Sequence, residues 1–152
     1  MLSNSIYRKL PVKRLLIAIL VIIFVSNIWP QSPNENWIVV STDKDQTTFI
    51  NVSGLSIYTG PEIFVWALQE LNAPLSMEDV SGEIFKVRTY YHINKSLNRY
   101  SIIQIIYYDV ESNVLKQYKY EHKYDAPDLK FNNPVVPGSE VYYILKKCLE
   151  FI

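Results

Sequence analysis

The alternation of apolar and polar residues predicts a β-rich domain over residues 37–152. Short runs of β-branched and aromatic residues are separated by turn-forming Asp, Asn, Gly and Pro, as expected for antiparallel strands. The predicted strands span residues 37–42, 47–52, 62–71, 84–93, 100–109 and 114–124. A helical pattern follows them. We therefore predict an α+β fold, an antiparallel sheet of about six strands with a C-terminal α-helix packed across one face.

Two strands and their connections carry more specific expectations. In 84–93, Phe85, Val87, Thr89, Tyr91 and Ile93 share one face, and Lys86, Arg88, Tyr90 and His92 form a solvated opposite face. In 100–109 both faces are apolar, with Ile102, Ile106 and Tyr108 opposite Ile103, Ile105 and Tyr107. That strand is expected to be central and covered on both sides. Residues 71–82 are expected to be an irregular connection, and Asn113 suits a positive φ in the turn after Asp109.

The last segment predicts an amphipathic helix that begins after Ser139, a suitable N-cap residue behind Pro137 and Gly138. The apolar stripe comprises Val141, Ile144, Leu145, Cys148, Leu149 and Ile152. The residues expected to face away are Glu140, Tyr143, Lys146, Lys147 and Glu150. We expect this helix to dock on the sheet by apolar contact alone.

The first 29 residues have the layout of an export signal. Arg8, Lys9, Lys13 and Arg14 precede eleven apolar residues, 15–25, and no charged residue follows until Glu35. This run suits a signal peptide better than a bilayer span, which needs about 20 residues. Residues 1–29 are therefore predicted to be a hydrophobic signal helix or, if uncleaved, a membrane anchor through residues 15–29. The basic head places the amino terminus in the cytoplasm and the rest across the membrane. Residues 30–36 are predicted to be a polar linker.

Composition changes the picture mainly through charge. The 152 residues, 49% hydrophobic and 20% charged, are ordinary for one domain. The net charge of zero hides an asymmetry, because beyond residue 14 the chain carries 11 basic against 15 acidic residues, a net of −4. The tract KQYKYEHKY, 116–124, mixes cations with aromatic rings, which in a cytosolic protein would suggest single-stranded nucleic acid. Export removes that partner. The tyrosines of the tract either rest on neighbouring side chains or grip another protein.

Candidate catalytic and metal-binding residues are few. The two histidines, His92 and His122, lie among Lys and Tyr with no serine- or cysteine-nucleophile motif nearby, and we interpret each as a solvated strand residue. Glu78 and Asp79 lie in a loop-like stretch, where solvation explains them better than acid–base chemistry. One thiol and two histidines 30 residues apart do not form a zinc motif, and four glycines supply no phosphate loop. We expect no enzymatic activity, no catalytic or metal-binding residues and no cofactor.

The order of these features resembles the surface-adhesin protein E family of bacterial exported domains over about residues 37–152. The similar segments are NWIVVSTD (36–43), FINVSGLSIYTGPEIFVWAL (49–68), SIIQIIYYDVESNVL (101–115) and NPVVPGSEVYYILKKC (133–148). The resemblance implies a sheet of about six antiparallel strands crossed by a C-terminal helix. It also implies attachment to host extracellular-matrix or serum proteins.

In that family a cysteine late in the helix is joined by a disulfide to a cysteine ahead of the strand that matches residues 100–109. Cys148 resembles the first of these, but Lys95 or Ser96 stands where its partner is expected. With one cysteine in the chain, no intramolecular disulfide can form. We expect a buried, inert thiol. An intermolecular disulfide, a reactive thiol and a metal ligand are the alternatives.

Two functions follow from this reading. The first is a non-enzymatic exported protein of the periplasm or outer surface of a Gram-negative bacterium, which binds a host matrix protein or another protein. The second is a structural or accessory envelope protein, anchored in the inner membrane and facing the periplasm, which self-associates or binds envelope machinery. A homodimer is expected under either, because the helix covers only one face of the sheet. A nucleic-acid partner is not expected.

Overall fold

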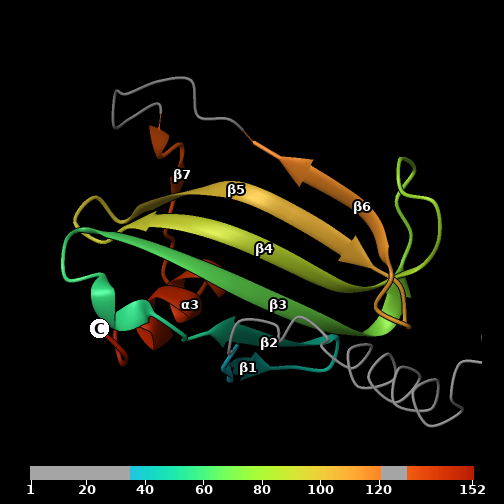
Figure 1. Ribbon diagram of the computed structural model, residues 1–152, viewed down its shortest axis with the longest axis horizontal. Helices are drawn as coiled ribbons and strands as arrows, with labels where there is room; N and C mark the ends of the chain where they lie inside the picture. Colours follow the sequence, from blue (N-terminus) through green and yellow to red (C-terminus); the bar gives the residue numbers. More distant parts are fainter. Residues whose placement is uncertain (1–34, 121–129) are drawn as a thin grey trace, which may run out of the picture. The chain divides into compact units, whose positions relative to one another are not determined.

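Six antiparallel strands follow one another in chain order across the sheet of the computed structural model, which describes residues 35–120 and 130–152 (Figure 1). The strands are β1 (Trp37–Thr42), β2 (Gln46–Asn51), β3 (Glu62–Leu75), β4 (Ile84–Asn94), β5 (Arg99–Tyr108) and β6 (Val114–Lys119). A two-residue strand, β7 (Asn133–Pro134), pairs with β5, a 3₁₀ turn, η1, spans Leu55–Ile57, and the helix α3 spans Glu140–Cys148. The α+β meander with a C-terminal helix is thus confirmed. The predicted leader and His122 lie outside the described residues.

Aspartate and asparagine side chains close three of the hairpins. Asp43 Oδ1 accepts the backbone N–H groups of residues 45 and 46 between β1 and β2. Asn94 Oδ1 accepts those of residues 96 and 97 between β4 and β5, and Asp109 Oδ1 accepts that of residue 113 between β5 and β6. Such local bonds let a turn form without glycine. In the last of these turns Ser112, with φ of 68°, adopts the left-handed conformation that we expected of Asn113.

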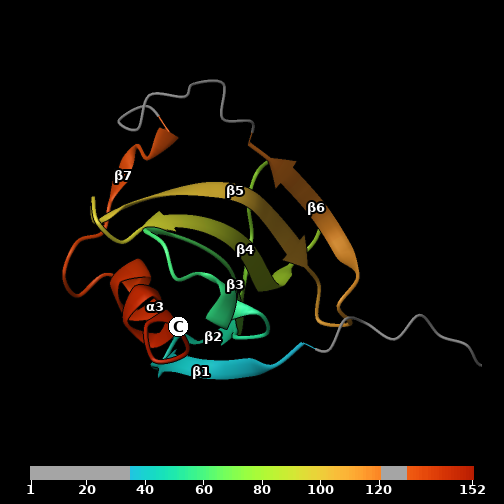
Figure 2. The same cartoon turned by 60° about the vertical axis from the view of Figure 1, so that its left-hand side comes forward.

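The face of the sheet that carries the core is here called the inner face, and Figure 2 shows α3 lying against it. Ile50 of β2, Val65 of β3 and Ile93 of β4 are packed there with Ile144 and Cys148 of α3. The register is consistent with this division, because Val65 pairs with Tyr91, and Ile63 pairs with Ile93. The predicted alternation of residues 84–93 is therefore correct for its apolar side.

Two sequence-based boundaries differ from the structure. β3 continues through Leu75, so residues 71–75 are strand where an irregular connection was expected, and the pairing with β4 shifts register between Glu70 and Leu75. β7 was not foreseen, because two residues carry no detectable period. It pairs with the start of β5 at Arg99 and Tyr100, beyond the part of β5 that β6 covers.

β5 is not the fully covered central strand that its two apolar faces suggested. Only Ser101 is buried along β5, and the other residues are half-buried. A nine-residue helix is about 13 Å long and cannot span six strands about 4.8 Å apart. A register shift opposite Tyr90 and Tyr91 also leaves Ile103 unpaired with β4. As a result Ile102 shares a face with Ile105, which corrects the predicted grouping of Ile102 with Ile106.

The helix follows the prediction at its start and departs from it in two places. Ser139 is the N-cap and its Oγ accepts the Tyr142 N–H at 3.2 Å. Glu140, expected to face solvent, instead accepts hydrogen bonds from Thr48 and Gln69 on the inner face. α3 ends at Cys148, so Leu149, which a longer helix would have turned inward, is exposed. The helix therefore docks by polar as well as apolar contacts.

Candidate functional site

The outer face of the sheet, on the side away from α3, carries the most distinctive set of side chains among the described residues. Trp66 pairs with Tyr90, and Leu68 pairs with Arg88, one position out of step with the inner-face residues Val65 and Ala67. Alternation places such residues on the opposite side of the sheet. The outer face comprises Phe64, Trp66 and Leu68 of β3, Arg88, Tyr90 and His92 of β4, and Ser101, Gln104 and Ile106 of β5.

Arg88 lies between two tryptophans on this face. The carbon atom of its guanidinium group is 4.5 Å from the ring centre of Trp66 and 5.2 Å from that of Trp37. The Trp66 and Tyr90 rings are stacked, with centres 4.6 Å apart. Cation–π contacts of this kind stabilise a guanidinium group over a ring face by about 0.5–2 kcal/mol, depending on desolvation. We name Trp37, Arg88, Trp66 and Tyr90 the tryptophan–arginine row, and all four residues are half-buried.

A carboxylate completes the row at one end. Arg88 Nη2 donates to Glu35 Oε1 at 2.7 Å, and Trp37 Nε1 donates to Glu35 Oε2 at 3.1 Å. Burial raises the pKa of Glu35, but the bonds from Arg88 and Trp37 outweigh it and the pKa is lowered overall. Arg88 Nε is buried and has no hydrogen-bond acceptor in the described part of the chain. The Nε–H group of Arg88 is therefore a buried donor that no described acceptor satisfies.

A hollow of about 200 Å³ opens beside Arg88. Lys86 lies two residues before Arg88 on the same side of β4, and its Nζ donates to Ser112 Oγ at 3.0 Å. Its only carboxylate contact in the described residues is with Glu70 at 3.7 Å. Leu68 and Tyr108 supply apolar wall. Two cations and apolar surface thus share one small depression.

His92, interpreted from the sequence as solvated, is 3% exposed, so that interpretation is wrong. Its ring stacks on Phe64 at 4.0 Å between centres, and the Phe131 ring meets its edge at 4.7 Å. His92 Nε2 lies 2.8 Å from Glu62 Oε2, and Lys130 Nζ is 3.5 Å from the same carboxylate. Phe131, two residues ahead of β7, contacts the histidine ring, and no local pattern in residues 84–93 could reveal that contact.

Ser101 lies opposite His92 across the β4–β5 pairing, so the structure brings a serine, a histidine and Glu62 to one part of the outer face. A nucleophile needs a hydrogen bond to its base and access to substrate. Ser101 is 1% exposed, and its Oγ has no hydrogen-bond partner in the described residues. Only His92 and Glu62 are in polar contact, and without a Ser101–His92 hydrogen bond the three residues lack the geometry of a catalytic triad.

Asp79 and the aromatic tract 116–124 meet each other. The Tyr118 hydroxyl donates to Asp79 Oδ2, and Lys116 Nζ donates to the Asp79 backbone oxygen at 2.6 Å. The bond from Tyr118 is the main reason why the pKa of Asp79 is lowered. Tyr118 pairs with Ile105 and so belongs to the inner-face side of β6. These residues fasten the β3–β4 connection to β6, and residues 121–124 of the tract lie outside the described residues.

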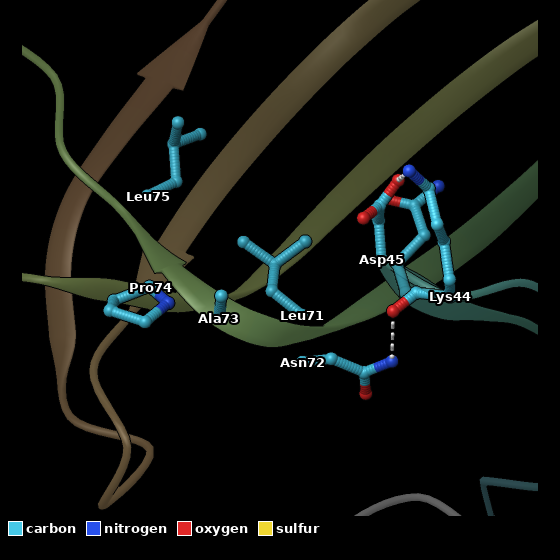
Figure 3. A pocket seen from close by; sticks show the side chains of 8 residues that line it. Lys44, Asp45, Leu71, Asn72, Ala73, Pro74 and Leu75 are labelled. Carbon is cyan, nitrogen blue, oxygen red and sulfur yellow. Dashed lines mark hydrogen bonds and ion pairs between the residues drawn. The ribbon is translucent and has the colours of Figure 1, made fainter.

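A further hollow, of about 420 Å³, lies where the β1–β2 turn meets the end of β3 (Figure 3). Asn72 Nδ2 donates to the Lys44 backbone oxygen at 3.0 Å, and the Asn72 N–H donates to the Asp45 oxygen at 2.9 Å. The Lys44–Asp45 ion pair is largely exposed and 3.9 Å long. These contacts hold the turn against β3, and an exposed pair of this length contributes little binding chemistry.

Cys148 points inward as predicted and is fully buried. Burial raises the pKa of its thiol to about 12, so the nucleophilic thiolate is scarce near neutral pH. Within residues 35–120 and 130–152, no group of three or more His, Cys, Asp or Glu residues could hold a metal ion. None of the helices in these residues is long and apolar enough to cross a membrane.

The tryptophan–arginine row was missed at the level of sequence. Its members come from β1, β3 and β4, and only the strand register brings them together. A usable signal was present, since Arg88 stands on the polar side of an alternating strand between two other polar positions. Comparisons with protein-family models, with curated proteins and with solved structures found no match for this chain.

Proposed function

We propose that this chain is an exported, non-enzymatic protein of the bacterial envelope that binds a protein partner through its outer face. The tryptophan–arginine row is the observation that carries this function. Trp, Tyr and Arg are the side chains most enriched where alanine substitution weakens protein–protein binding. Here they are contiguous, in mutual stacking and cation–π contact, and only half-buried. A partner can therefore complete their burial at small entropic cost.

The partner expected from the resemblance to surface-adhesin protein E domains is a host extracellular-matrix or serum protein. Export rests on the basic head and apolar run of residues 1–29. The location of the domain decides which class of partner it can meet. A domain at the cell surface meets host proteins, whereas one anchored in the inner membrane meets envelope proteins.

Binding is tested by applying the full chain to a panel of immobilised extracellular-matrix and serum proteins. Trp66→Ala and Arg88→Gln should each weaken capture at least several-fold, because each removes part of the row. Tyr143→Ala is the matched control, since Tyr143 is an exposed aromatic residue on α3. Urea denaturation of each variant separates lost binding from lost folding. Equal capture by Tyr143→Ala and by folded row variants, or no capture at all, would contradict this function.

Self-association is the second candidate, and the edge strand β1 favours it. β1 pairs only with β2 among the described strands, and Val39 on its outer side is 48% exposed. An edge strand with free backbone groups can pair with another copy. Light scattering on the full chain should then give a dimer at micromolar concentration. Mass spectrometry of the mature amino terminus with envelope fractionation decides between the two settings, because an intact residue 1 in the inner membrane favours the accessory role.

A further inference from the structure

We propose that the hollow beside Arg88 binds the carboxylate of an acidic side chain from a protein partner, in the place that Glu35 now fills. This inference rests on the proposed function and names the chemistry that the partner must bring. The site would take a glutamate or aspartate with an apolar neighbour. It is built by Arg88, Lys86, Trp37 and the walls around them.

The first observation is that this place already holds a carboxylate. Glu35 is bound by two donors, Arg88 Nη2 at 2.7 Å and Trp37 Nε1 at 3.1 Å. Charge-assisted bonds of this length are roughly twice as strong as neutral ones. The chain's own side chain therefore shows that these donors bind a carboxylate.

The second observation is that the donors exceed what Glu35 uses. Arg88 Nε is buried and has no acceptor in the described part of the chain. A carboxylate that takes the place of Glu35 and approaches side-on would engage Nε and Nη2 together. Lys86 adds a second cation, whose Nζ donates to Ser112 Oγ at 3.0 Å and lies 3.7 Å from Glu70. A carboxylate that enters the hollow would therefore meet Lys86 as well as Arg88.

The third observation concerns size and walls. Pockets for whole small-molecule ligands usually measure roughly 300–1,000 Å³. This hollow is about 200 Å³, which suits one side chain. Leu68, Tyr108 and the Trp37 ring offer apolar contact to the methylene groups of that side chain or to its neighbour.

Glu35 can be replaced without unfolding the sheet. β1 begins at Trp37, and the chain ahead of it is fixed at Asn36, whose N–H donates to Ser53 Oγ at 3.0 Å. Only the Glu35 side chain has to rotate away for a partner carboxylate to enter. Glu35 therefore acts as a competitor, and its removal should strengthen binding.

The experiment measures binding of two acetylated, C-terminally amidated peptides to the full chain. One has a central glutamate between leucines, and its match has glutamine there. Amidation removes the terminal carboxylate as an alternative source. The Trp37 indole N–H resonance reports occupancy directly. We expect the glutamate peptide to shift it and the glutamine peptide to bind roughly tenfold more weakly.

Three variants sharpen the test. Glu35→Gln should bind the glutamate peptide several-fold more tightly, because the internal competitor loses its charge. Arg88→Lys keeps the charge but not the two-pronged geometry, and should bind it roughly tenfold more weakly. Lys44→Gln, at the exposed β1–β2 turn, is the control and should bind as the unchanged chain does.

Equal binding of the two peptides, unchanged binding by Arg88→Lys, or weaker binding by Glu35→Gln would each overturn the carboxylate site. If the peptides bind equally while Trp66→Ala still weakens capture of a protein partner, the binding function stands and this inference alone fails. If neither peptide binds and no protein is captured, both fail.

Discussion

Replacement of Glu140 by alanine tests whether polar contacts help to hold α3 on the sheet. The Glu140 carboxylate accepts a hydrogen bond from Thr48 Oγ1 at 2.8 Å and a forked one from Gln69 Nε2 at 2.9 Å to both oxygens. Thr48 is fully buried, so its hydroxyl would be left without this acceptor and without water. An unsatisfied buried donor costs about 1–3 kcal/mol, whereas Gln69 is half-buried and can be rehydrated.

A second contribution comes from the position of Glu140 in the first turn of α3, where a negative charge gains about 0.3–1 kcal/mol from the helix dipole. Together these effects predict a loss of about 1.3–4 kcal/mol in the free energy of unfolding. Urea denaturation of the full chain, followed by tryptophan fluorescence, measures it. Glu150→Ala is the matched control. Glu150 is exposed and pairs with Lys147 at 2.8 Å, so it should cost less than about 1 kcal/mol.

A double-mutant cycle identifies the cause. Thr48→Val removes the buried hydroxyl, so Glu140→Ala should cost clearly less in that background than in the unchanged chain. Two results would refute the reasoning. One is a loss for Glu140→Ala no larger than that for Glu150→Ala. The other is strict additivity of Thr48→Val and Glu140→Ala, which would mean that apolar packing alone positions the helix.

Three further predictions concern single residues. The Cys148 thiol, buried and with a pKa raised to about 12, should not react with a chromogenic disulfide reagent at pH 8 until urea unfolds the chain, as absorbance would show. Burial raises the pKa of Glu62, but His92 and Lys130 outweigh it and the pKa is lowered. Glu62 therefore stabilises the fold above the unfolded carboxyl pKa and loses that effect as pH falls through the lowered value. Glu62→Gln should thus reduce the urea midpoint at pH 7, and this reduction should shrink as the pH falls through the lowered pKa of Glu62. Phe131→Ala should lower the free energy of unfolding by about 3–5 kcal/mol, since Phe131 is 1% exposed, and Phe131→Leu by less, both measured by urea denaturation.

The sequence was most informative where structure is decided locally. Alternation and turn residues located all six long strands, and three of the hairpins are closed within a few residues by side chains such as Asp43 and Asn94. The start of α3 was equally readable, since the Ser139 cap acts on the residue three positions later. Such features need no knowledge of the distant chain.

Features that depend on register or on distant segments were beyond the sequence. The register shift beside Tyr91 changes which residues of β5 share a face, and no residue type in the strand predicts that shift. His92 is buried by Phe131, which lies 39 positions away in the chain. Glu140 was assigned to the solvent side, although Thr48 and Gln69 donate hydrogen bonds to it on the inner face. The tryptophan–arginine row likewise exists only once three strands are aligned.

The meander has a consequence for the order in which the molecule assembles. Every long strand pairs with its neighbour in the chain. Successive hairpins can therefore form one after another, and each closes only a short loop at a small cost in chain entropy. The apolar inner face, however, stays exposed until residues 140–148 fold as α3 and pack Ile144 and Cys148 against it. Before α3 docks, the partly folded sheet exposes apolar surface and is prone to aggregate. A chaperone that binds unfolded chains would bind the inner face, which α3 later covers.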